Sequence, residues 1–410
     1  MMEKDVVIIG GGPAGLAAAI ELWKKGITNI LILEREAYLG GILRQCIHDG
    51  FGLTRFGETL SGPEYAQRFI DEVETLKIPY ITDAMVLDIS KDKVVTAACR
   101  DGLKTWKSKA VVLAMGCRER PRGALGIPGE RPAGVFTAGT AQAYMNIYNR
   151  MPGKEVIILG SGDIGMIMAR RMTLEGAHVK GVFEIMPYAA GLPRNIQQCL
   201  KDYNIPLYLS HTVTEIKGNS RLQSVIVSKV DEHMQPIAGT EKEYTCDTLI
   251  LSVGLIPENE LSSRAGIALD GQTKGAVVDE YFQTQIPGIF AAGNVLHVHD
   301  LVDFVSQEAE QLADSAAAYV QGEVLNKCDI SVHCGQGVGN LVPQRISANE
   351  DVTLAFRVRF PKRNGKIVIT QNGNVVLTKP FKRAVPAEMM HINVQKAKLQ
   401  HTGDLEVAMV

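Results

Sequence analysis

The sequence has few cysteines, few aromatic residues and almost no net charge. Its seven cysteines, at positions 46, 99, 117, 199, 246, 328 and 334, form no C-x-x-C pair. Dispersed thiols of this kind are typical of a reducing cytoplasm and supply no ligand set for zinc or an iron–sulfur cluster. Lys and Arg total 43 against 45 Asp and Glu, without a basic stripe, which argues against nucleic acid as a partner.

Long apolar runs and a secretory leader are also missing. The first residues, MMEKDVVIIGGGPAG, enter a strand almost at once and show neither a charged leader region nor a cleavage site. Glycine and proline interrupt the apolar segment that follows, so it falls short of the about 18 apolar residues that a membrane helix needs. We therefore expect no membrane span and a cytoplasmic location.

Glycine, in contrast, is abundant and clustered, with 40 residues in a chain of 410. This length allows two or three domains. The apolar run at 5–9 predicts a buried parallel strand, and residues 16–26 predict a helix that ends at Gly26. Between them lies a loop with the G-x-G-x-x-G spacing, formed by Gly10, Gly12, Pro13, Ala14 and Gly15.

Each glycine of this loop has a separate physical role in a dinucleotide-binding turn. The first permits the tight turn, the second lets backbone approach a pyrophosphate, and the third lets helix and strand pack closely. The helix N-terminus then attracts the anionic phosphates. A second strand closes on Glu34, 19 residues past Gly15, where a carboxylate can accept hydrogen bonds from ribose hydroxyls.

The same arrangement occurs a second time, in residues 154–186. A strand leads into a glycine loop and a helix, and Glu184 again lies 19 residues past the third glycine. The loop is formed by Gly160, Gly162, Asp163, Ile164 and Gly165. Two matches with equal spacing argue against chance clustering of glycine. Because Glu184 would repel a 2′-phosphate and the next arginine is Arg194, we predict NAD(H) rather than NADP(H) at this site.

Two further segments carry a resemblance to known proteins. Residues 109–121 predict an apolar strand that ends in AMG, and residues 286–322 combine a strand, a glycine turn and a long helix. With the two loops, these segments resemble flavoproteins with two dinucleotide-binding domains, the pyridine-nucleotide-disulfide oxidoreductase superfamily, over roughly residues 4–325. The resemblance implies FAD at the first loop and the nicotinamide dinucleotide at the second.

The resemblance also implies the domain organisation. It predicts an α/β fold with two Rossmann-like dinucleotide-binding domains, followed here by a small β-rich C-terminal domain. The FAD-binding domain would be split between residues 1–122 and 253–325. The NAD-binding domain, residues 123–252, would be inserted between the two parts, and residues 326–410 would form the β-rich domain.

Further cofactor-binding positions follow from the resemblance alone. For the flavin these are Arg35, Gly41, Val86, Ala114, Gly116, Gly293, Asn294, Leu301 and Val302, and for the nicotinamide Gly254. The family usually has Asp where Asn294 stands, next to the ribityl chain, but an amide can still hydrogen-bond a hydroxyl. The helix that begins near Asp300 is expected to direct its N-terminus towards the flavin. The pattern identifies no metal ligand and no catalytic side chain.

The segment LGGILRQCIHDGFG contains a single cysteine, Cys46, in a region where many flavin enzymes carry a redox pair. No other cysteine follows within 50 residues, so disulfide-reductase chemistry is not expected. Two interpretations stay open. Cys46 is either a small residue packed near the flavin, or a lone redox thiol whose pKa is lowered by Arg44 and His48.

In the C-terminal tail, residues 326–410, apolar and polar residues alternate as they do in a series of strands. Hairpin turns are predicted at Asn364-Gly365 and Asn372-Gly373. With GGILRQCIHDGFG and FAAGNVLHVHDLVD, the tail resembles the FAD/NAD subunits that accompany glycerol-3-phosphate dehydrogenase-like flavoproteins of anaerobic bacteria. More distantly it resembles subunits of dye-linked amino-acid dehydrogenases and opine oxidases. The resemblance implies a partner subunit that oxidises the substrate.

These observations predict an FAD-dependent NAD(H) oxidoreductase that transfers hydride between nicotinamide and flavin as the electron-transfer subunit of a multi-subunit dehydrogenase. Two alternatives stay open. One is a stand-alone NADH oxidase or peroxidase that uses Cys46, and the other is a non-catalytic nucleotide-binding interaction protein. The loop histidines His48, His297 and His299 are interpreted as ordinary hydrogen-bonding residues.

Overall fold

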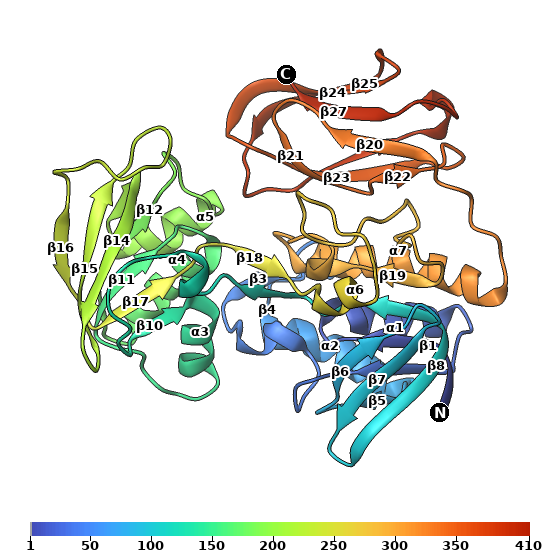
Figure 1. The fold of residues 1–410 in the computed structure, drawn as a ribbon, viewed down its shortest axis with the longest axis horizontal. Coiled ribbons are helices and arrows are strands. Elements are labelled where there is room, and N and C mark those ends of the chain that lie inside the picture. The colour runs from blue at the N-terminus through green and yellow to red at the C-terminus, as the bar shows by residue number, and fades with distance from the viewer. Residues whose placement is uncertain (1) are drawn as a thin grey trace. The chain divides into compact units, whose positions relative to one another are not determined.

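The computed structural model describes residues 2–410. The chain divides into two compact units. The first contains the residues up to Cys117 and from Pro257 onward, and the second contains Arg118–Ile256 (Figure 1). The second unit is thus inserted into the first. The C-terminal strands group with the first unit, so the finer division into three domains stays a prediction.

A seven-stranded sheet forms the centre of the first unit. Its strands are β1 (Met2–Ile9), β2 (Ile30–Leu33), β5 (Tyr80–Ile81), β6 (Met85–Ile89), β7 (Val94–Cys99), β8 (Gly102–Leu113) and β19 (Ile289–Ala291). The order is β5-β2-β1-β8-β7-β6, and β19 also pairs with β8. Five strands run parallel to one another: β5, β2, β1, β8 and β19. The pairs β6–β7 and β7–β8 are antiparallel. Two short strands, β3 (Asp49–Phe51) and β4 (Leu60–Ser61), pair separately.

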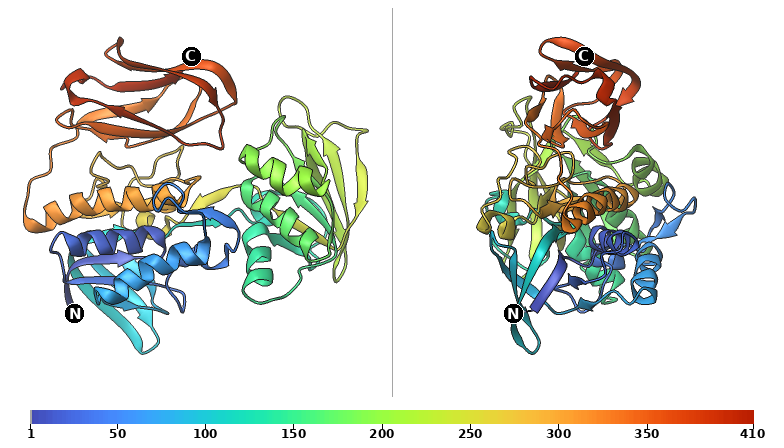
Figure 2. Two further views of the ribbon diagram at one scale, coloured as in Figure 1. Left: turned by 180° about the vertical axis from the view of Figure 1, so that it is seen from behind. Right: turned by 90° about the vertical axis from the view of Figure 1, so that its right-hand side faces the viewer.

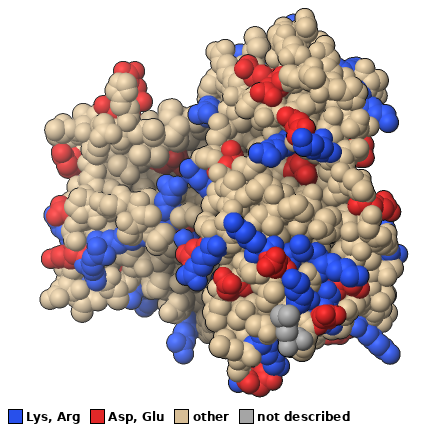
Figure 3. Space-filling view, turned by 45° about the vertical axis from the view of Figure 1, so that its right-hand side comes forward, with Lys and Arg blue, Asp and Glu red and all other residues tan. Residues whose placement is uncertain are grey.

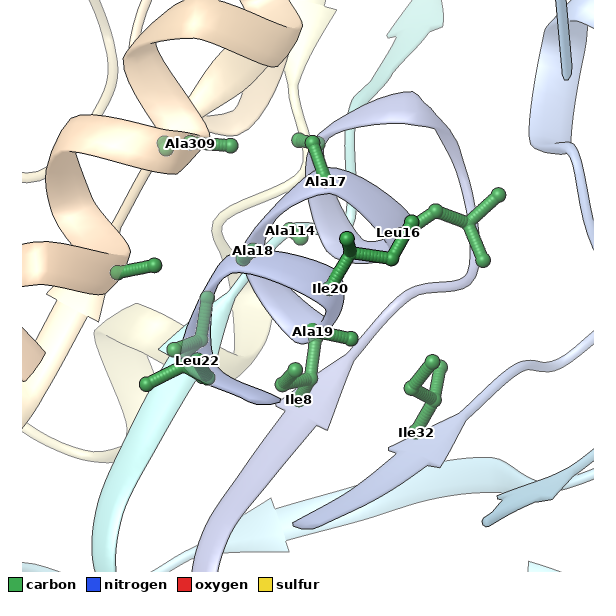
Figure 4. Close-up of a cluster of buried hydrophobic side chains, with 14 of the residues drawn as sticks. Ile8, Leu16, Ala17, Ala18, Ala19, Ile20, Leu22, Ile32, Ala114 and Ala309 are labelled. Atoms are coloured by element: carbon green, nitrogen blue, oxygen red, sulfur yellow. The ribbon is translucent and has the colours of Figure 1, made fainter. Parts of the chain in front are cut away.

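Three helices cover one face of this sheet: α1 (Pro13–Lys24), α2 (Gly62–Thr75) and α7 (Val302–Gln321) (Figure 2). Small residues of α1 let it pack closely against both the sheet and α7. Figure 4 shows Ala17, Ala18 and Ala19 among the buried aliphatic side chains of this core. A second core lies on the opposite face of the sheet, where α6 (Glu260–Arg264) contributes Leu261. The parallel strands are therefore buried on both faces, as their continuous apolar runs predict.

The second unit contains a five-stranded parallel sheet of order β10-β17-β11-β12-β13. Its strands are β10 (Val135–Thr137), β11 (Glu155–Leu159), β12 (His178–Glu184), β13 (Leu207–Leu209) and β17 (Thr248–Leu251). Two helices, α3 (Ala138–Asn146) and α4 (Asp163–Leu174), pack in one apolar core with it. A second core joins the sheet to the antiparallel strands β14 (His211–Gly218), β15 (Leu222–Lys229) and β16 (Lys242–Thr245). The unit also contains the short helix α5 (Pro193–Asn195). The chain enters the unit along β9 (Cys117–Glu119) and leaves it along β18 (Leu255–Pro257), and these two strands pair with each other.

The tail forms two small sheets around a core of its own. One sheet has the order β22-β20-β27-β24-β25, with strands β20 (Ile330–Cys334), β22 (Arg345–Ile346), β24 (Lys362–Gln371), β25 (Asn374–Ala384) and β27 (Leu405–Met409). The other has the order β21-β23-β26, with strands β21 (Val338–Val342), β23 (Val352–Val358) and β26 (Met390–Val394). We call residues 330–410 the C-terminal sandwich.

The surface of the molecule displayed in Figure 3 carries basic and acidic side chains interspersed.

One of the two predicted hairpin turns is correct. Asn372 and Gly373 both have positive φ, 53° and 76°, and they join β24 to β25. The turn predicted at Asn364-Gly365 is wrong, because β24 runs straight through it. Asn364 has φ 52° but does not shift the register with β25, because Arg363 pairs with Arg383 and Gly365 pairs with Phe381. Gly365 is required there because a Cβ would come within 2.5 Å of the ring of Phe381.

Candidate functional site

The first glycine loop is built on two close backbone approaches. Gly10 follows β1 with φ +108°, and a Cβ there would lie 2.3 Å from the carbonyl oxygen of Ala114, which follows β8. A Cβ at Gly15 would lie 1.8 Å from the carbonyl oxygen of Gly10. Both positions therefore exclude any side chain. The α1 N-terminus is held directly above the turn, where its free N–H groups are available to an anion.

Three other predicted residues lie beside this loop. A Cβ at Gly41 would come within 3.0 Å of the Cα of Gly12, and one at Gly293 within 3.0 Å of the Cβ of Ala14. Pro13 occupies the first turn of α1, where its missing N–H costs no hydrogen bond. The structure thus brings the loop, residue 41 and the turn at residue 293 together around one glycine-lined backbone surface. Such a surface fits the extended pyrophosphate of a dinucleotide.

Glu34 is buried and anchored at the end of β2. Its Oε2 accepts a hydrogen bond from the N–H of Gly11 at 2.7 Å, and its Oε1 accepts one from the N–H of Glu36 at 2.8 Å. A carboxylate offers about four acceptor positions, so the anchored group can still receive ribose hydroxyls. Residues that follow β2 and residues in and just after β5 line a groove of about 470 Å³, among them Tyr38, Tyr80 and Thr82.

The second loop repeats the first one in atomic detail. Gly160 has φ +94°, and a Cβ there would lie 2.1 Å from the carbonyl oxygen of Ser252. A Cβ at Gly165 would lie 2.6 Å from the Cβ of Ser252. Ser252 follows β17, and its Oγ also accepts a hydrogen bond from the N–H of Gly165 at 3.1 Å. It thus occupies the place that Ala114 takes in the first unit.

Glu184 is held as Glu34 is, with one additional hydrogen bond. Its Oε2 accepts from the N–H of Ser161 at 2.9 Å and from the Oγ of Ser161 at 2.6 Å, and its Oε1 accepts from the N–H of Met186 at 2.9 Å. Glu184 is buried, so its charge faces any group bound at the strand end without much screening. Asp163, at the start of α4, instead accepts hydrogen bonds from the following loop, from the N–H of Leu192 and the side chain of Asn195.

Asn294 lies between two loops of the first unit. Its Oδ1 accepts a hydrogen bond from the N–H of His299 at 3.0 Å, and its Nδ2 lies 3.6 Å from the Sγ of Cys117. The amide oxygen is therefore used within the protein, whereas one N–H of the amide can still donate to a ligand. Leu301 is the N-cap of α7, and Val302 is its first residue.

A buried carboxylate organises this turn from the middle of α7. Oε1 of Glu308 accepts from the N–H of Gly293 at 2.7 Å. Its Oε2 lies 2.6 Å from Nε2 of His297 and 3.4 Å from Nε2 of His299. Burial alone would raise the pKa of Glu308, but the attraction and hydrogen bonds of the two histidines outweigh it and hold this pKa below its ordinary range. The three side chains could also face a cation, and of their contacts the 2.6 Å one between His297 and Glu308 is a hydrogen bond.

Cys46 lies in a buried position just after the short helix Gly41–Gln45. Burial raises the pKa of its thiol to about 12. This shift is opposite to the sequence-based hypothesis that Arg44 and His48 lower the pKa of Cys46. Arg44 instead places its guanidinium 4.4 Å from the ring centre of Tyr38. The thiol donates to the carbonyl oxygen of Ile42 at 3.4 Å. Since the thiolate is the reactive form, these surroundings favour the interpretation of Cys46 as a packing residue.

The remaining predicted residues contribute less defined contacts. Val86 buries its side chain in the second core of the sheet, so only its backbone is available to a ligand. Arg35 is exposed, with its Nε 3.8 Å from Glu36. Gly116 and Gly254 have φ +71° and +100°, and they follow the corresponding strands β8 and β17 of the two units. Ile164 packs partly buried against the core of the second unit. Their assignment to cofactor contacts stays a prediction.

Sequence reasoning missed four residues that support the two loops: Gly11, Ser161, Ser252 and Glu308. Alignment of the two glycine loops with each other would have placed Gly11 opposite Ser161, and alignment of the strand ends would have placed Ala114 opposite Ser252. Glu308 could not be found this way, because it lies inside a helix and its partners are 11 and 15 residues away.

The chain belongs to the pyridine nucleotide-disulphide oxidoreductase family, which it matches over residues 4–344. It is 25% identical to hydrogen cyanide synthase subunit HcnB of Pseudomonas protegens over 72% of this chain and 66% of that protein. It is 26% identical to one of the subunits of opine oxidase from Agrobacterium tumefaciens over 71% of this chain and 61% of that protein. The chain thus spans less than two thirds of these two relatives.

The fold is also similar to that of solved structures. Thioredoxin reductase of T. acidophilum superposes with a TM-score of 0.64 and 25% identity, over 78% of this chain and 99% of that one. The predicted α/β fold and the superfamily assignment are confirmed by these matches. The protein is therefore an oxidoreductase of a family whose cofactors are FAD and a nicotinamide dinucleotide. Within residues 2–410, no helix is long and apolar enough to cross a membrane.

Proposed function

We propose that the chain is an FAD-dependent NAD(H) oxidoreductase that serves as the electron-transfer subunit of a larger dehydrogenase of the glycerol-3-phosphate or amino-acid type. The single observation that carries the proposal is the duplicated cradle: two glycine loops, each with a buried and anchored glutamate, in a chain without a thiol pair. When both cofactors are bound, they exchange a hydride between nicotinamide and flavin.

The residues of the first unit would hold FAD through backbone and side-chain contacts. The loop from Gly10 to Gly15 leaves room for the pyrophosphate, and Glu34 accepts from the adenine-side ribose. Asn294 would donate to the ribityl chain through the amide N–H that makes no hydrogen bond within residues 2–410. The N-terminus of α7 carries a partial positive charge, which would favour negative charge on a bound flavin.

The residues of the second unit would hold NAD(H). The loop from Gly160 to Gly165 repeats the pyrophosphate surface, and Glu184 accepts from the ribose hydroxyls. The same carboxylate disfavours a 2′-phosphate, which supports NAD(H) over NADP(H). The raised pKa of Cys46 removes the main support for a thiol-based oxidase or peroxidase.

A partner subunit is supported by the kind of proteins to which the chain is similar. Both relatives described above are named as subunits, and their names denote enzymes that act on small molecules. A chain that lacks a redox thiol pair needs another route for electrons to enter or leave, and a partner subunit would provide it.

An anaerobic titration tests the proposal directly. The purified full chain, loaded with FAD, is expected to lose the visible absorbance of its oxidised flavin on stoichiometric addition of NADH. Fully loaded protein that keeps its absorbance in excess NADH would refute hydride transfer. Tight NAD binding by protein that takes up no FAD would instead favour the non-catalytic alternative.

A further inference from the structure

The C-terminal sandwich has two strand edges without a partner on the same side. Among residues 2–410, strand β25 pairs only with β24, and strand β26 pairs only with β23. A groove of about 430 Å³ lies between these two edges. It is lined by Val375, Val376, Leu377, Thr378 and Lys379 of β25, by Ile392 and Asn393 of β26, and by Lys398. Figure 1 shows β25 in the outer sheet of the sandwich, whereas β23 lies in the sheet nearer to α7.

The floor and the rim of this groove differ in character. Val376, Leu377 and Ile392 belong to or pack on the apolar core of the sandwich, and Val375 is 64% exposed. Lys379 and Lys398 are both exposed at the rim. An extended chain that alternates apolar and acidic residues would match this pattern, because successive side chains of a strand point to opposite sides.

The charge of the surrounding segment is strongly one-sided. Between residues 359 and 403 the sequence has nine Lys or Arg and a single acidic residue, Glu388, although the whole chain has a net charge of -2. Glu388 pairs with Arg383 at 3.3 Å. The lysines at the groove therefore receive no carboxylate from their own segment, and the sandwich forms a basic region on an otherwise acidic chain.

We infer that this groove is a docking site for an extended acidic segment of a partner protein, which adds a strand to the edge of β25. Backbone hydrogen bonds to β25 would supply affinity, and Lys379 and Lys398 would select acidic side chains. Pro380 has no N–H, so the added strand pairs with residues 374–379 and ends there. The inference rests on the proposed function only in requiring that a partner subunit exists.

Lysine and proline on an edge strand can also serve only to prevent unspecific pairing with the edges of other chains. The test must therefore distinguish a docking site from an edge that is merely protected against aggregation. The probe is a labelled nine-residue peptide of alternating Glu and Val, added to the FAD-loaded full chain. Its first control is the same peptide with alternate backbone nitrogens methylated, which keeps the charge but cannot pair as a strand. Its second control has Lys in place of Glu.

The expected result is saturable binding of the Glu–Val peptide alone, with slowed amide hydrogen exchange within residues 374–379. The double variant Lys379→Glu/Lys398→Glu is expected to weaken binding at least tenfold, whereas Lys201→Glu/Lys229→Glu, at exposed positions of the second unit, leaves it unchanged. Reduction of the flavin by NADH should be the same in all variants, so a failure of docking is distinguishable from a failure of the proposed function.

Three outcomes would overturn the inference. These are equal binding of the methylated peptide, an affinity of the groove variant within twofold of the unmodified protein, and absence of binding by the Glu–Val peptide. A fourth test uses anionic phospholipid vesicles. If they bind the unmodified protein but not the groove variant, the groove binds a membrane surface instead, and the inference of a docked peptide is wrong.

Discussion

At the scale of single residues, two buried carboxylates carry most of the specific chemistry. Glu34 and Glu184 both accept the N–H of the second residue in their glycine loop and the N–H two positions along the chain. They are therefore fixed before any ligand arrives. A fixed acceptor discriminates more sharply than a mobile one, because it cannot move away from a group it repels.

Removal of the charge at Glu184 should relax nucleotide selectivity. The variant Glu184→Gln keeps the shape of the side chain but no longer repels a 2′-phosphate. We expect the ratio of kcat/KM for NADPH to that for NADH to rise about tenfold or more. Steady-state kinetics with both nucleotides measures it, and Glu175→Gln on the exposed end of α4 is the matched control. An unchanged ratio would mean that Glu184 does not face the ribose.

Glu308 should be important for both stability and FAD binding, since it holds Gly293, His297 and His299 together. In Glu308→Ala the buried partners lose their common acceptor, which we expect to cost about 3 kcal/mol in the free energy of unfolding. The dissociation constant for FAD should rise as well, because the turn that carries Asn294 loosens.

Urea unfolding and fluorescence titration with FAD measure the two effects at Glu308. Glu323→Ala, an exposed glutamate just after the same helix, is the control. The depressed pKa of Glu308 stabilises the fold above the ordinary carboxyl pKa, and this contribution is lost as the pH falls. A variant with normal stability and normal FAD affinity would contradict the assigned role.

At the scale of secondary-structure elements, the C-terminal sandwich is fastened to the loop that precedes α7. The guanidinium of Arg357 in β23 donates to the carbonyl oxygens of Pro386 and Ala387 at 2.8 and 2.6 Å and to that of Val298 at 3.1 Å. The N–H of Met389 donates to Asp300 at 3.2 Å, and the rings of Phe304 and His391 lie 4.5 Å apart. The sandwich thus restrains the segment between Asn294 and α7.

Loss of this attachment should weaken FAD binding without removing a direct contact. In Arg357→Met the carbonyl oxygen of Val298 loses a charged donor, and we expect the FAD dissociation constant to rise about 5- to 30-fold, which corresponds to about 1–2 kcal/mol. Arg363→Met, exposed on β24 of the same sandwich, should have no effect. Equal FAD affinity of the two variants would show that the sandwich and the cofactor site are independent.

The elements themselves were predicted from sequence with uneven success. Both strand–loop–helix units and the long helix after residue 300 were found, because apolar period and glycine spacing are local signals. The hairpin predicted at Asn372-Gly373 is correct, whereas the one predicted at Asn364-Gly365 is wrong, since Asn364 adopts a positive φ inside a continuous strand without reversing the chain. The attachment through Arg357 and the cluster at Glu308 depend on residues distant in sequence, for which the local pattern contains no signal.

At the scale of the whole molecule, one buried acid makes folding stability depend on pH. Burial raises the pKa of Asp279 to about 6, although its Oδ1 accepts from the N–H groups of Tyr281 and Gln283. The folded state therefore binds more protons than the unfolded state between about pH 4 and pH 6. Through this residue, stability is highest at low pH and falls as the pH rises through that window.

The variant Asp279→Asn keeps the acceptor oxygen and removes the charge. Relative to the unmodified protein, it should be more stable at pH 7, by at most about 3 kcal/mol, and the difference should shrink towards pH 4. Thermal unfolding of both proteins across this range measures the trend. A constant difference between pH 4 and pH 7 would show that Asp279 titrates as it does in the unfolded chain.

The near-identity of the two cradles has a consequence for ligand selection. FAD and NAD share an ADP moiety, and under the proposed function each cradle would contact only that shared part, with Ser161 in place of Gly11 as the difference at the anchored glutamate. Selection between the two ligands must therefore come from the far end of each molecule, at Asn294 and the α7 N-terminus for FAD. ADP-ribose, which lacks both rings, is accordingly expected to compete at both cradles.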